Sequence, residues 1–175
     1  MKRPEATEFA EFYASYIAKV PGTDFLSVLD SERQQMLQLF SGRAERDGNF
    51  RYAPGKWTVK EVLGHITDTE RIFTYRALRI GRGDQTPLPG FEQDDFVKNG
   101  GFALRKLANL AEEFGAVRGA SLALFRSFDE EAWSRRGVAS QKEVTVRALG
   151  FITAGHQIHH RIILEQNYFP AIPRA

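Results

Sequence analysis

The four histidines are the residues of this sequence whose type and spacing could do chemistry, and they occupy two short stretches. His65 lies in the first stretch, and His156, His159 and His160 lie in the second. If the second stretch is helical, His156 and His160 stand one turn apart on one face, with Cβ atoms roughly 5–6 Å apart. That spacing suits two imidazoles that bind one cation, and His65 can supply a third ligand from another helix. The pattern predicts a three-histidine metal site inside a helical bundle.

A structural role is the alternative for each histidine. A single histidine on an apolar helix face usually satisfies its ring nitrogens with hydrogen bonds, and this interpretation stays open for His65 taken alone. The pair His156 and His160 favours a metal, because two buried neutral rings must each find a donor and an acceptor. A metal binds one nitrogen of each ring and leaves the other N–H for a nearby acceptor. His159 has no partner at the i,i+4 spacing, so three roles stay open for it: support of a ligand, proton transfer, or simple exposure.

Three histidines in a chain without cysteine indicate zinc, nickel, copper or iron(II) rather than calcium or magnesium. Three protein ligands leave at least one coordination position open, which is typical of catalytic rather than structural zinc sites. Neutral imidazoles leave the full charge on the ion, so a bound water or a bound thiol can ionise near neutral pH. Because the chain has no cysteine of its own, a reacting thiol has to arrive on a substrate.

Of the charged residues that follow His65 within the same predicted helix, we single out Asp68, Glu70 and Arg76. Each is a candidate for proton transfer, for contact with a substrate or for support of a metal ligand. The alternative is that they are surface charges paired with neighbours three or four residues away. The sequence is compatible with both interpretations.

Helical periodicity predicts the elements that must position these residues. The clearest start is at Thr58, because Thr58 and Glu61 have the spacing of a capping box. Thr145 is the expected N-cap of the last helix, which carries the second histidine stretch. The aromatic residues of the first predicted helix are interpreted as core or dimer surface. No segment alternates with period two for long enough to predict a sheet. The expected helices are 7–19, 24–40, 58–80, 102–128 and a last one that begins after 145.

The connection over residues 81–101 is rich in proline and glycine and is unusually long for a compact domain, which often indicates a functional segment. In a bundle it can be the crossover that joins two parallel neighbouring helices. Residues 135–141 are expected to form a turn. Gly64 and Gly155 each precede a proposed ligand, and we expect them to let two helices approach closely, although a glycine inside a helix costs about 1 kcal/mol relative to alanine.

The composition bounds the class of protein. A chain of 175 residues is long enough for one domain with a substantial core, and we expect a single domain over residues 1–175. The net charge is only +2 and no run of basic residues is present, so no nucleic-acid partner is expected. The apolar runs are too short to span a membrane and the charged N-terminus leads into no signal core. A soluble, cytoplasmic protein is expected.

Three sequence motifs resemble those of the DinB/YfiT-like superfamily: residues 55–65 (GKWTVKEVLGH), 68–71 (DTER) and 155–160 (GHQIHH). Residues 87–91 (PLPGF) also fit its DinB_2 branch. The resemblance extends over nearly the whole chain. It implies an all-α fold, a four-helix bundle with up-down-down-up order, to which this chain adds the short extra N-terminal helix.

The resemblance also implies a divalent metal, nickel or zinc, that is bound by three histidines. By position these are His65, His156 and His160, the same three residues that the spacing indicates. Many members of the superfamily are homodimers, so a homodimer is expected.

Members of the superfamily include thiol-dependent S-transferases that use bacillithiol, mycothiol or glutathione, and proposed metal-dependent hydrolases. The leading hypothesis is therefore a metal-dependent enzyme that activates a low-molecular-weight thiol for S-transfer to an electrophilic substrate. One alternative is a hydrolase that uses metal-bound hydroxide, with Asp68 or Glu70 as proton acceptor. The other is a bundle without enzymatic activity that binds a metal or a small ligand. No motif in the sequence separates the three.

Overall fold

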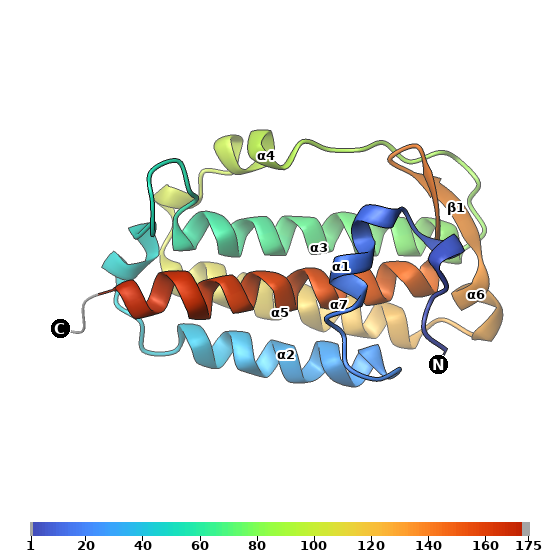
Figure 1. Ribbon diagram of the computed structural model, residues 1–175, viewed down its shortest axis with the longest axis horizontal. Helices are drawn as coiled ribbons and strands as arrows, with labels where there is room; N and C mark the ends of the chain where they lie inside the picture. The colour runs from blue at the N-terminus through green and yellow to red at the C-terminus, as the bar shows by residue number, and fades with distance from the viewer. Residues whose placement is uncertain (1, 173–175) are drawn as a thin grey trace.

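Four long helices form a bundle in the computed structural model, which describes residues 2–172 (Figure 1). Figure 1 shows α2 and α7 running in one direction and α3 and α5 in the other, which is the up-down-down-up order. Helix α3 packs against α5 and α7, and α2 packs against the same two helices. The predicted all-α bundle and its helix order are thus confirmed. The four helices are α2 (Phe25–Phe40), α3 (Val59–Gly81), α5 (Leu107–Arg126) and α7 (Val146–Ile163).

Shorter elements cover the sides and ends of the bundle. Three are α-helices: α1 (Ala14–Ile17), α4 (Gln93–Asn99) and α6 (Glu130–Ser134). Two are strands that pair antiparallel as a hairpin, β1 (Arg136–Ala139) and β2 (Lys142–Thr145). The remaining elements are the 3₁₀ turns Ala6–Glu8, Glu11–Tyr13, Glu45–Asn49, Phe102–Leu104 and Phe169–Ala171, and the π turn Leu164–Tyr168.

Side-chain caps fix the starts of the two helices that carry the histidines. The Thr58 hydroxyl accepts a hydrogen bond from the Glu61 amide, and the Glu61 carboxylate accepts one from the Thr58 amide, at 3.2 and 2.6 Å. This is the predicted capping box. The Thr145 hydroxyl accepts a hydrogen bond from the Ala148 amide at 3.0 Å, as expected of an N-cap. A cap of this kind is typically worth about 1 kcal/mol, and here the two caps set where α3 and α7 begin.

The N-terminal segment departs from the single helix predicted over residues 7–19. Phe9 is extended, with φ −155° and ψ 161°, and interrupts the segment between two 3₁₀ turns. The physical reason is tertiary, because the buried Glu8 carboxylate accepts hydrogen bonds from the Thr145 hydroxyl and from the Arg147 guanidinium at the start of α7. The extra N-terminal helix is therefore present only as the four-residue α1.

The long connection is the crossover that was predicted, and it contains α4. Figure 1 shows it running back along the outside of α3, so that α5 can start beside the start of α3. Helix α5 begins at Leu107 rather than at residue 102, because a separate 3₁₀ turn precedes it. The turn predicted over residues 135–141 is part of the β hairpin, so the expectation of no sheet was wrong. Its strands have only four residues each, too few to show an alternating pattern.

The crossover also pairs with the hairpin. The Leu88 amide donates to the carbonyl of Val138 at 2.8 Å, and the Ser140 amide donates to the carbonyl of Leu88 at 3.0 Å. Both hydrogen bonds join segments far apart in the sequence. They place the Pro- and Gly-rich part of the crossover against the hairpin turn.

A buried polar layer divides the bundle core. One apolar cluster, with Phe25 and Phe151, lies toward the hairpin, and a second, with Leu63 and Phe114, fills the opposite end. Between the clusters, polar side chains from all four long helices are buried, and each bonds to at least one other across the bundle. These residues are Glu32, His65, Glu70, Arg118, His156 and Gln157. In the described range 2–172, no helix is both long and apolar enough to cross a membrane.

The expectation that Gly64 and Gly155 let α3 and α7 approach each other is wrong. A Cβ atom on Gly64 would lie 2.3 Å from the Phe102 ring, and one on Gly155 would lie 2.0 Å from the carbonyl oxygen of Tyr16. Gly64 therefore makes room for the 3₁₀ turn Phe102–Leu104, which follows the crossover, and Gly155 makes room for the backbone of α1. In both cases the glycine allows a segment outside the long helices to pack against the histidine-bearing helix.

We expect Gly155→Ala to destabilise the protein, because backbone atoms of Tyr16 cannot yield as a flexible side chain would. Overpacking of this kind typically costs about 1–3 kcal/mol, which exceeds the gain of about 1 kcal/mol from helix propensity. Urea denaturation of the variant measures the change in the free energy of unfolding. Gly119→Ala on α5 is the matched control, since its Cβ would meet nothing closer than 3.7 Å and should be neutral or stabilising. Equal stabilisation by both substitutions would contradict the tight packing of α1 on α7.

Candidate metal centre

Three histidines converge inside the bundle. His65 comes from α3, and His156 and His160 come from successive turns of α7. Their potential ligand nitrogens all lie within 4.8 Å of one another, and the Nε2 atoms of His65 and His156 are 3.1 Å apart. The ring centroids of the three pairs are 4.6–5.0 Å apart. The residues singled out by their spacing are thus brought together as one cluster, which can hold one metal ion.

Electrostatics keep these imidazoles neutral. Burial lowers the pKa of His65 to about 4. Burial, followed by the charges of the neighbouring histidines, also holds the pKa values of His156 and His160 well below the ordinary value. Because a metal competes with protons for the same nitrogen lone pairs, rings that are neutral at pH 7 are ready to act as ligands. The donor set therefore suits a borderline divalent cation.

The surroundings of the cluster hold the rings in place. The Thr69 hydroxyl lies 3.4 Å from Nδ1 of His65, and a hydrogen bond there leaves Nε2 free to face the other histidines. The Trp57 ring packs against His65 with centroids 4.7 Å apart, and the Tyr16 ring packs against His156 at 5.4 Å. Thr69 could have been found from the sequence, since it lies one turn after His65. Tyr16 was assigned to core or dimer surface, and the structure places it against the histidines instead.

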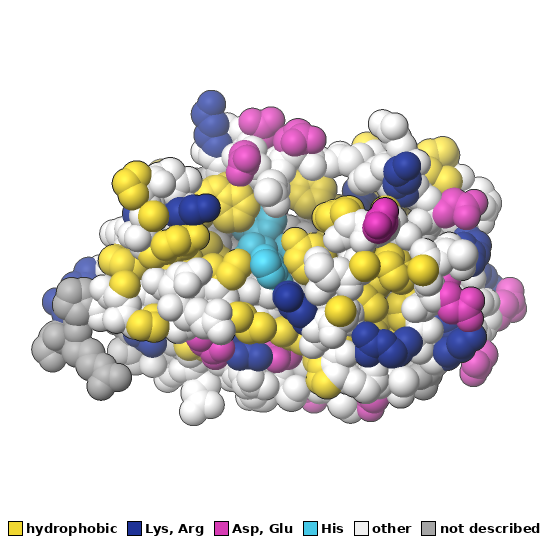
Figure 2. Space-filling model, viewed as in Figure 1, with side chains coloured by type: hydrophobic (Ala, Val, Ile, Leu, Met, Phe, Trp, Pro, Cys, Tyr) yellow, Lys and Arg dark blue, Asp and Glu magenta, His cyan; other side chains and the backbone are white. Residues whose placement is uncertain are grey.

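A cavity of about 960 Å³ opens beside His65 and His156. Figure 2 shows histidine side chains reaching the surface between hydrophobic side chains on this face of the molecule. The other walls come from the N-terminal segment, from α3, from the crossover and from the hairpin turn, so the long connection does contribute to the candidate site. The volume is typical of sites that enclose a small molecule. Besides the two histidines, the walls include Glu11, Tyr13, Tyr16, Thr69, Phe73, Phe91, Glu92, Ser140 and Lys142.

Neither carboxylate that was proposed as a proton acceptor lines this cavity. Asp68 is half-buried and pairs with Arg71, with an Nη1 to Oδ1 distance of 3.0 Å. Glu70 is buried, and both of its oxygens accept hydrogen bonds from the Arg118 guanidinium at 2.7 Å. Arg118 also donates to the carbonyl of Leu29 at 2.9 Å. A carboxylate that is desolvated this far needs such a partner, so the structure gives Glu70 a structural ion pair in place of the predicted role.

The remaining two candidates lie close to the cavity. His159 is half-buried, with its ring centroid 5.0 Å from that of His160 and 5.3 Å from that of Tyr16, but it does not belong to the ligand cluster. Arg76 is buried and donates to the Pro89 carbonyl and to the Ser140 hydroxyl at 2.7 and 3.0 Å. Arg76 therefore links α3 to the crossover and to the hairpin turn.

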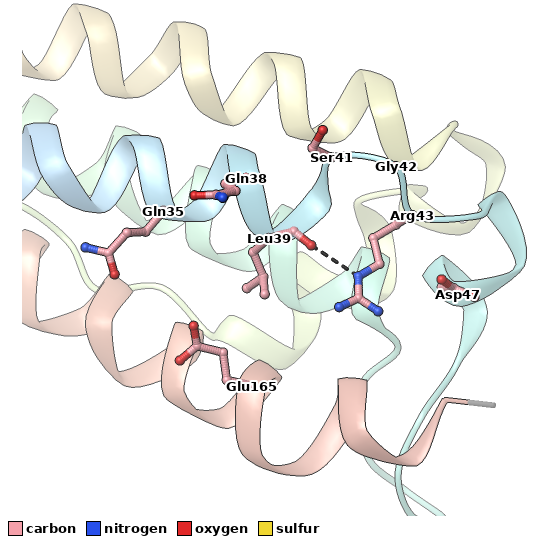
Figure 3. A pocket seen from close by; sticks show the side chains of 8 residues that line it. All are labelled: Gln35, Gln38, Leu39, Ser41, Gly42, Arg43, Asp47 and Glu165. Atoms are coloured by element: carbon pink, nitrogen blue, oxygen red, sulfur yellow. Dashed lines mark hydrogen bonds between the residues drawn. The ribbon is translucent and has the colours of Figure 1, made fainter. Parts of the chain in front are cut away.

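A second pocket, of about 530 Å³, lies where α2 ends. Figure 3 shows Gln35, Gln38 and Leu39 on α2, with Glu165 on the segment opposite. The Arg43 side chain folds back and donates to the Leu39 carbonyl at 3.2 Å. This pocket has no histidine in its lining, so we take the cavity beside the histidine cluster as the candidate site.

Comparisons with solved structures show the same fold in two proteins. YfiT from Bacillus subtilis, described as "a probable metal-dependent hydrolase with an unusual four-helix bundle topology", superposes with a TM-score of 0.66 and 15% identity, over 91% of this chain and 87% of YfiT. The mycothiol-dependent maleylpyruvate isomerase superposes with a TM-score of 0.68 and 14% identity, over 90% of this chain and 66% of that protein. A histidine-to-alanine variant of the isomerase gives 0.67, with the same identity and coverage.

This chain thus spans about two thirds of the isomerase, and at these identities the likeness is one of fold. No curated protein sequence matches the chain. A family model described as the DinB superfamily matches residues 29–164, which include all four long helices except the first turn of α2. Because that match covers most of the sequence, the chain belongs to the DinB superfamily.

Proposed function

We propose that this protein is a metal-dependent enzyme that activates a low-molecular-weight thiol and transfers its sulfur to the electrophilic carbon of a second substrate. One observation carries the proposal: three neutral imidazoles converge beside a cavity of about 960 Å³, in a chain without any thiol of its own. The ligand set is made of neutral groups, and the cavity offers room for a substrate next to it. A structural ion would need no such space.

His65, His156 and His160 are the residues that would hold the ion, with zinc or nickel as first candidates. When bound, an ion that keeps its full charge favours the thiolate form of a sulfur ligand. In the reaction the S–H bond breaks and its proton leaves the site, the sulfur forms a bond to the electrophilic carbon, and the bond from that carbon to its leaving group breaks, so that the leaving group departs as an anion, as chloride does from a chlorodinitrobenzene. We assign proton transfer toward solvent to His159, because its half-buried ring lies against His160.

Two further residues of the chain support this chemistry by position. Thr69 selects the ring orientation of His65 through its contact with Nδ1. The Tyr16 ring covers His156 and His159 and limits access of water to the cluster. The fold shared with a mycothiol-dependent isomerase supports a thiol as one of the two reactants.

Hydrolysis is the second candidate, supported by the fold shared with YfiT and by the description of that protein. A hydrolase needs a group that accepts a proton from the attacking water. Since Asp68 and Glu70 do not line the cavity, Glu11 and Glu92, which do, are the carboxylates to test for this role.

The test is a rate measurement on metal-loaded protein with a panel of small thiols and a chlorodinitrobenzene as electrophile. We expect at least one thiol to react faster than it does with His156→Ala, by about tenfold or more, because that substitution removes a ligand. The same preparations are screened with esters and amides between pH 6 and 9. If no thiol exceeds the variant while an ester does, hydrolysis replaces the proposal. If both screens stay flat while the metal raises the melting temperature, the bundle is a binding protein.

A further inference from the structure

Arg76 is one of two fully buried arginines in residues 2–172, and the two have opposite surroundings. Arg118 forms a bidentate ion pair with Glu70. Arg76 has no carboxylate within ion-pair distance in the described part of the chain, although it is only 2% exposed. A buried charge without a counter-charge is unfavourable, because desolvation is not offset by an ion pair. Within the described residues, the protein therefore does not itself compensate the buried charge of Arg76.

The protein groups around Arg76 are neutral. Its two hydrogen bonds, to the Pro89 carbonyl and the Ser140 hydroxyl, both come from Nη2. The titratable group that acts on it is Tyr13, and burial raises the pKa of that hydroxyl, so it stays protonated at neutral pH. Among residues 2–172, the groups that meet this guanidinium are thus the Pro89 carbonyl, the Ser140 hydroxyl and the Tyr13 hydroxyl, and none of them is charged. Three neutral oxygens do not supply a counter-charge, so the guanidinium keeps the capacity to bind an anionic ligand.

Arg76 lies against the wall of the candidate cavity, in contact with residues that line it. Its hydrogen-bond partner Ser140, its electrostatic neighbour Tyr13 and the Phe91 ring 6.0 Å from its guanidinium carbon all line that cavity. Lys142 adds an exposed positive charge to the same wall. Glu11 and Glu92 also line the cavity, but both are exposed and keep their hydration, so they require no partner.

The positions of His65 and Arg76 on α3 determine how far apart the two side chains lie along the cavity. Arg76 follows His65 by eleven positions, which at 100° per residue returns it to nearly the same helix face. At 1.5 Å per residue the two Cα atoms are about 16 Å apart along the axis. Thr69 and Phe73, which line the cavity, lie between them on that face. The cavity thus extends from the histidine cluster to the side chains that contact the buried guanidinium.

We propose that Arg76 binds a carboxylate of the cavity's ligand, so that the substrate class is an elongated carboxylic acid. The inference rests on the proposed function for what lies at the far end, where the histidines hold the reacting group. A planar carboxylate matches the planar fork of a guanidinium and supplies the missing charge. The carboxylate is on the thiol or on the electrophile, and the experiment separates these sources. In this assignment Arg76 is a specificity-determining residue.

The test compares matched pairs of ligands by isothermal titration calorimetry on metal-loaded protein. The first pair is a series of ω-mercaptoalkanoates of increasing length and the corresponding ω-mercaptoalkanols. The second is a chloronitrobenzoate and its amide, which places the carboxylate on the electrophile. We expect the carboxylate to bind about tenfold or more tightly than its neutral partner in at least one pair, at an optimal chain length. In Arg76→Met that preference is expected to disappear, while binding of the neutral partner is unchanged.

Two control variants separate recognition from packing. Arg79→Met removes an arginine on the same helix that pairs with Asp84 at the surface, and the preference should survive. Arg76→Lys keeps the charge but loses the planar fork, so part of the preference should remain. If Arg76→Met does not fold, Arg76→Lys is compared with Ser140→Ala, which loses only the hairpin contact and should keep the full preference.

The outcomes distinguish this inference from the proposed function. Equal affinity of wild-type protein for the members of every pair, or a preference that persists in Arg76→Met, overturns the inference. Sulfur-free alkanoates form a third arm. If they bind in an Arg76-dependent manner while no thiol binds at all, the thiol chemistry is wrong and the carboxylate site stands. If thiols bind equally well whatever group is at their far end, the carboxylate site is wrong and the thiol chemistry stands.

Discussion

Alanine in place of His156 or His160 is expected to abolish tight binding of a divalent cation. Loss of a group that merely hydrogen-bonds to a metal ligand costs about 10–100-fold in affinity, so loss of one of three ligands should cost more than about 100-fold. The wild-type chain should bind one zinc or nickel ion, measured by competition with a chromophoric chelator and by metal analysis after dialysis. Saturating metal should also raise its melting temperature, because binding to the folded state alone stabilises it.

His159→Ala is the internal control for this experiment. His159 neighbours His160 in the sequence and in space, but its ring nitrogens are not part of the three-histidine cluster. We expect the variant to bind one ion with affinity close to that of the wild type. If alanine variants of all four histidines lost the same metal affinity, the loss would indicate a general effect of charge or folding. Unaltered binding in both His156→Ala and His160→Ala would show that the cluster is not the metal site.

Removing one partner of the Glu70–Arg118 pair should cause the largest loss of stability. Both side chains are almost completely buried, at 2% and 0% exposure. A single substitution, Glu70→Ala or Arg118→Met, leaves an uncompensated charge in the core, which costs about 3–5 kcal/mol. Urea denaturation, with circular dichroism to follow the helices, measures the free energy of unfolding.

The double substitution Glu70→Met with Arg118→Met tests the cause of that loss. No unpaired charge remains in it, so it should be more stable than either single variant. Asp68→Ala is the control for a solvent-accessible pair, since Asp68 is only half-buried and its partner Arg71 is exposed, and such pairs contribute about 0–1 kcal/mol. Single variants that lose less than about 1 kcal/mol would contradict a structural role for Glu70 and reopen its role as a proton acceptor.

Glu70 illustrates what the sequence leaves open. On α3 it is one of two acidic residues that follow His65, and local spacing treats it like Asp68. Arg118 lies in another helix, far along the chain, and nothing in the sequence links the two. Because the partner of a buried charge is chosen by helix packing, the burial of Glu70 could not be read from its neighbours in the sequence.

The structure of the N-terminal segment also could not be predicted from its local sequence. Its aromatic residues have helical spacing, yet Glu8 is held by Thr145 and Arg147 and the helix is interrupted. As a result Tyr16 lies against His156 rather than in the core. A turn was predicted over residues 135–141, but the two strands that make it a hairpin and place it at the far wall of the cavity were missed because they are so short.

The sequence by itself determined the starts of α3 and α7, the helix face shared by His156 and His160 and, through its family motifs, the bundle in which His65 meets them. These features depend on caps and periodicity, which act over a few residues and are written directly in the chain. Only the tertiary structure decided which segments enclose the cavity, that Glu70 is neutralised by Arg118, and that Arg76 is buried without a counter-charge. Those features depend on contacts between segments far apart in the sequence, and such contacts are selected by packing of the whole bundle.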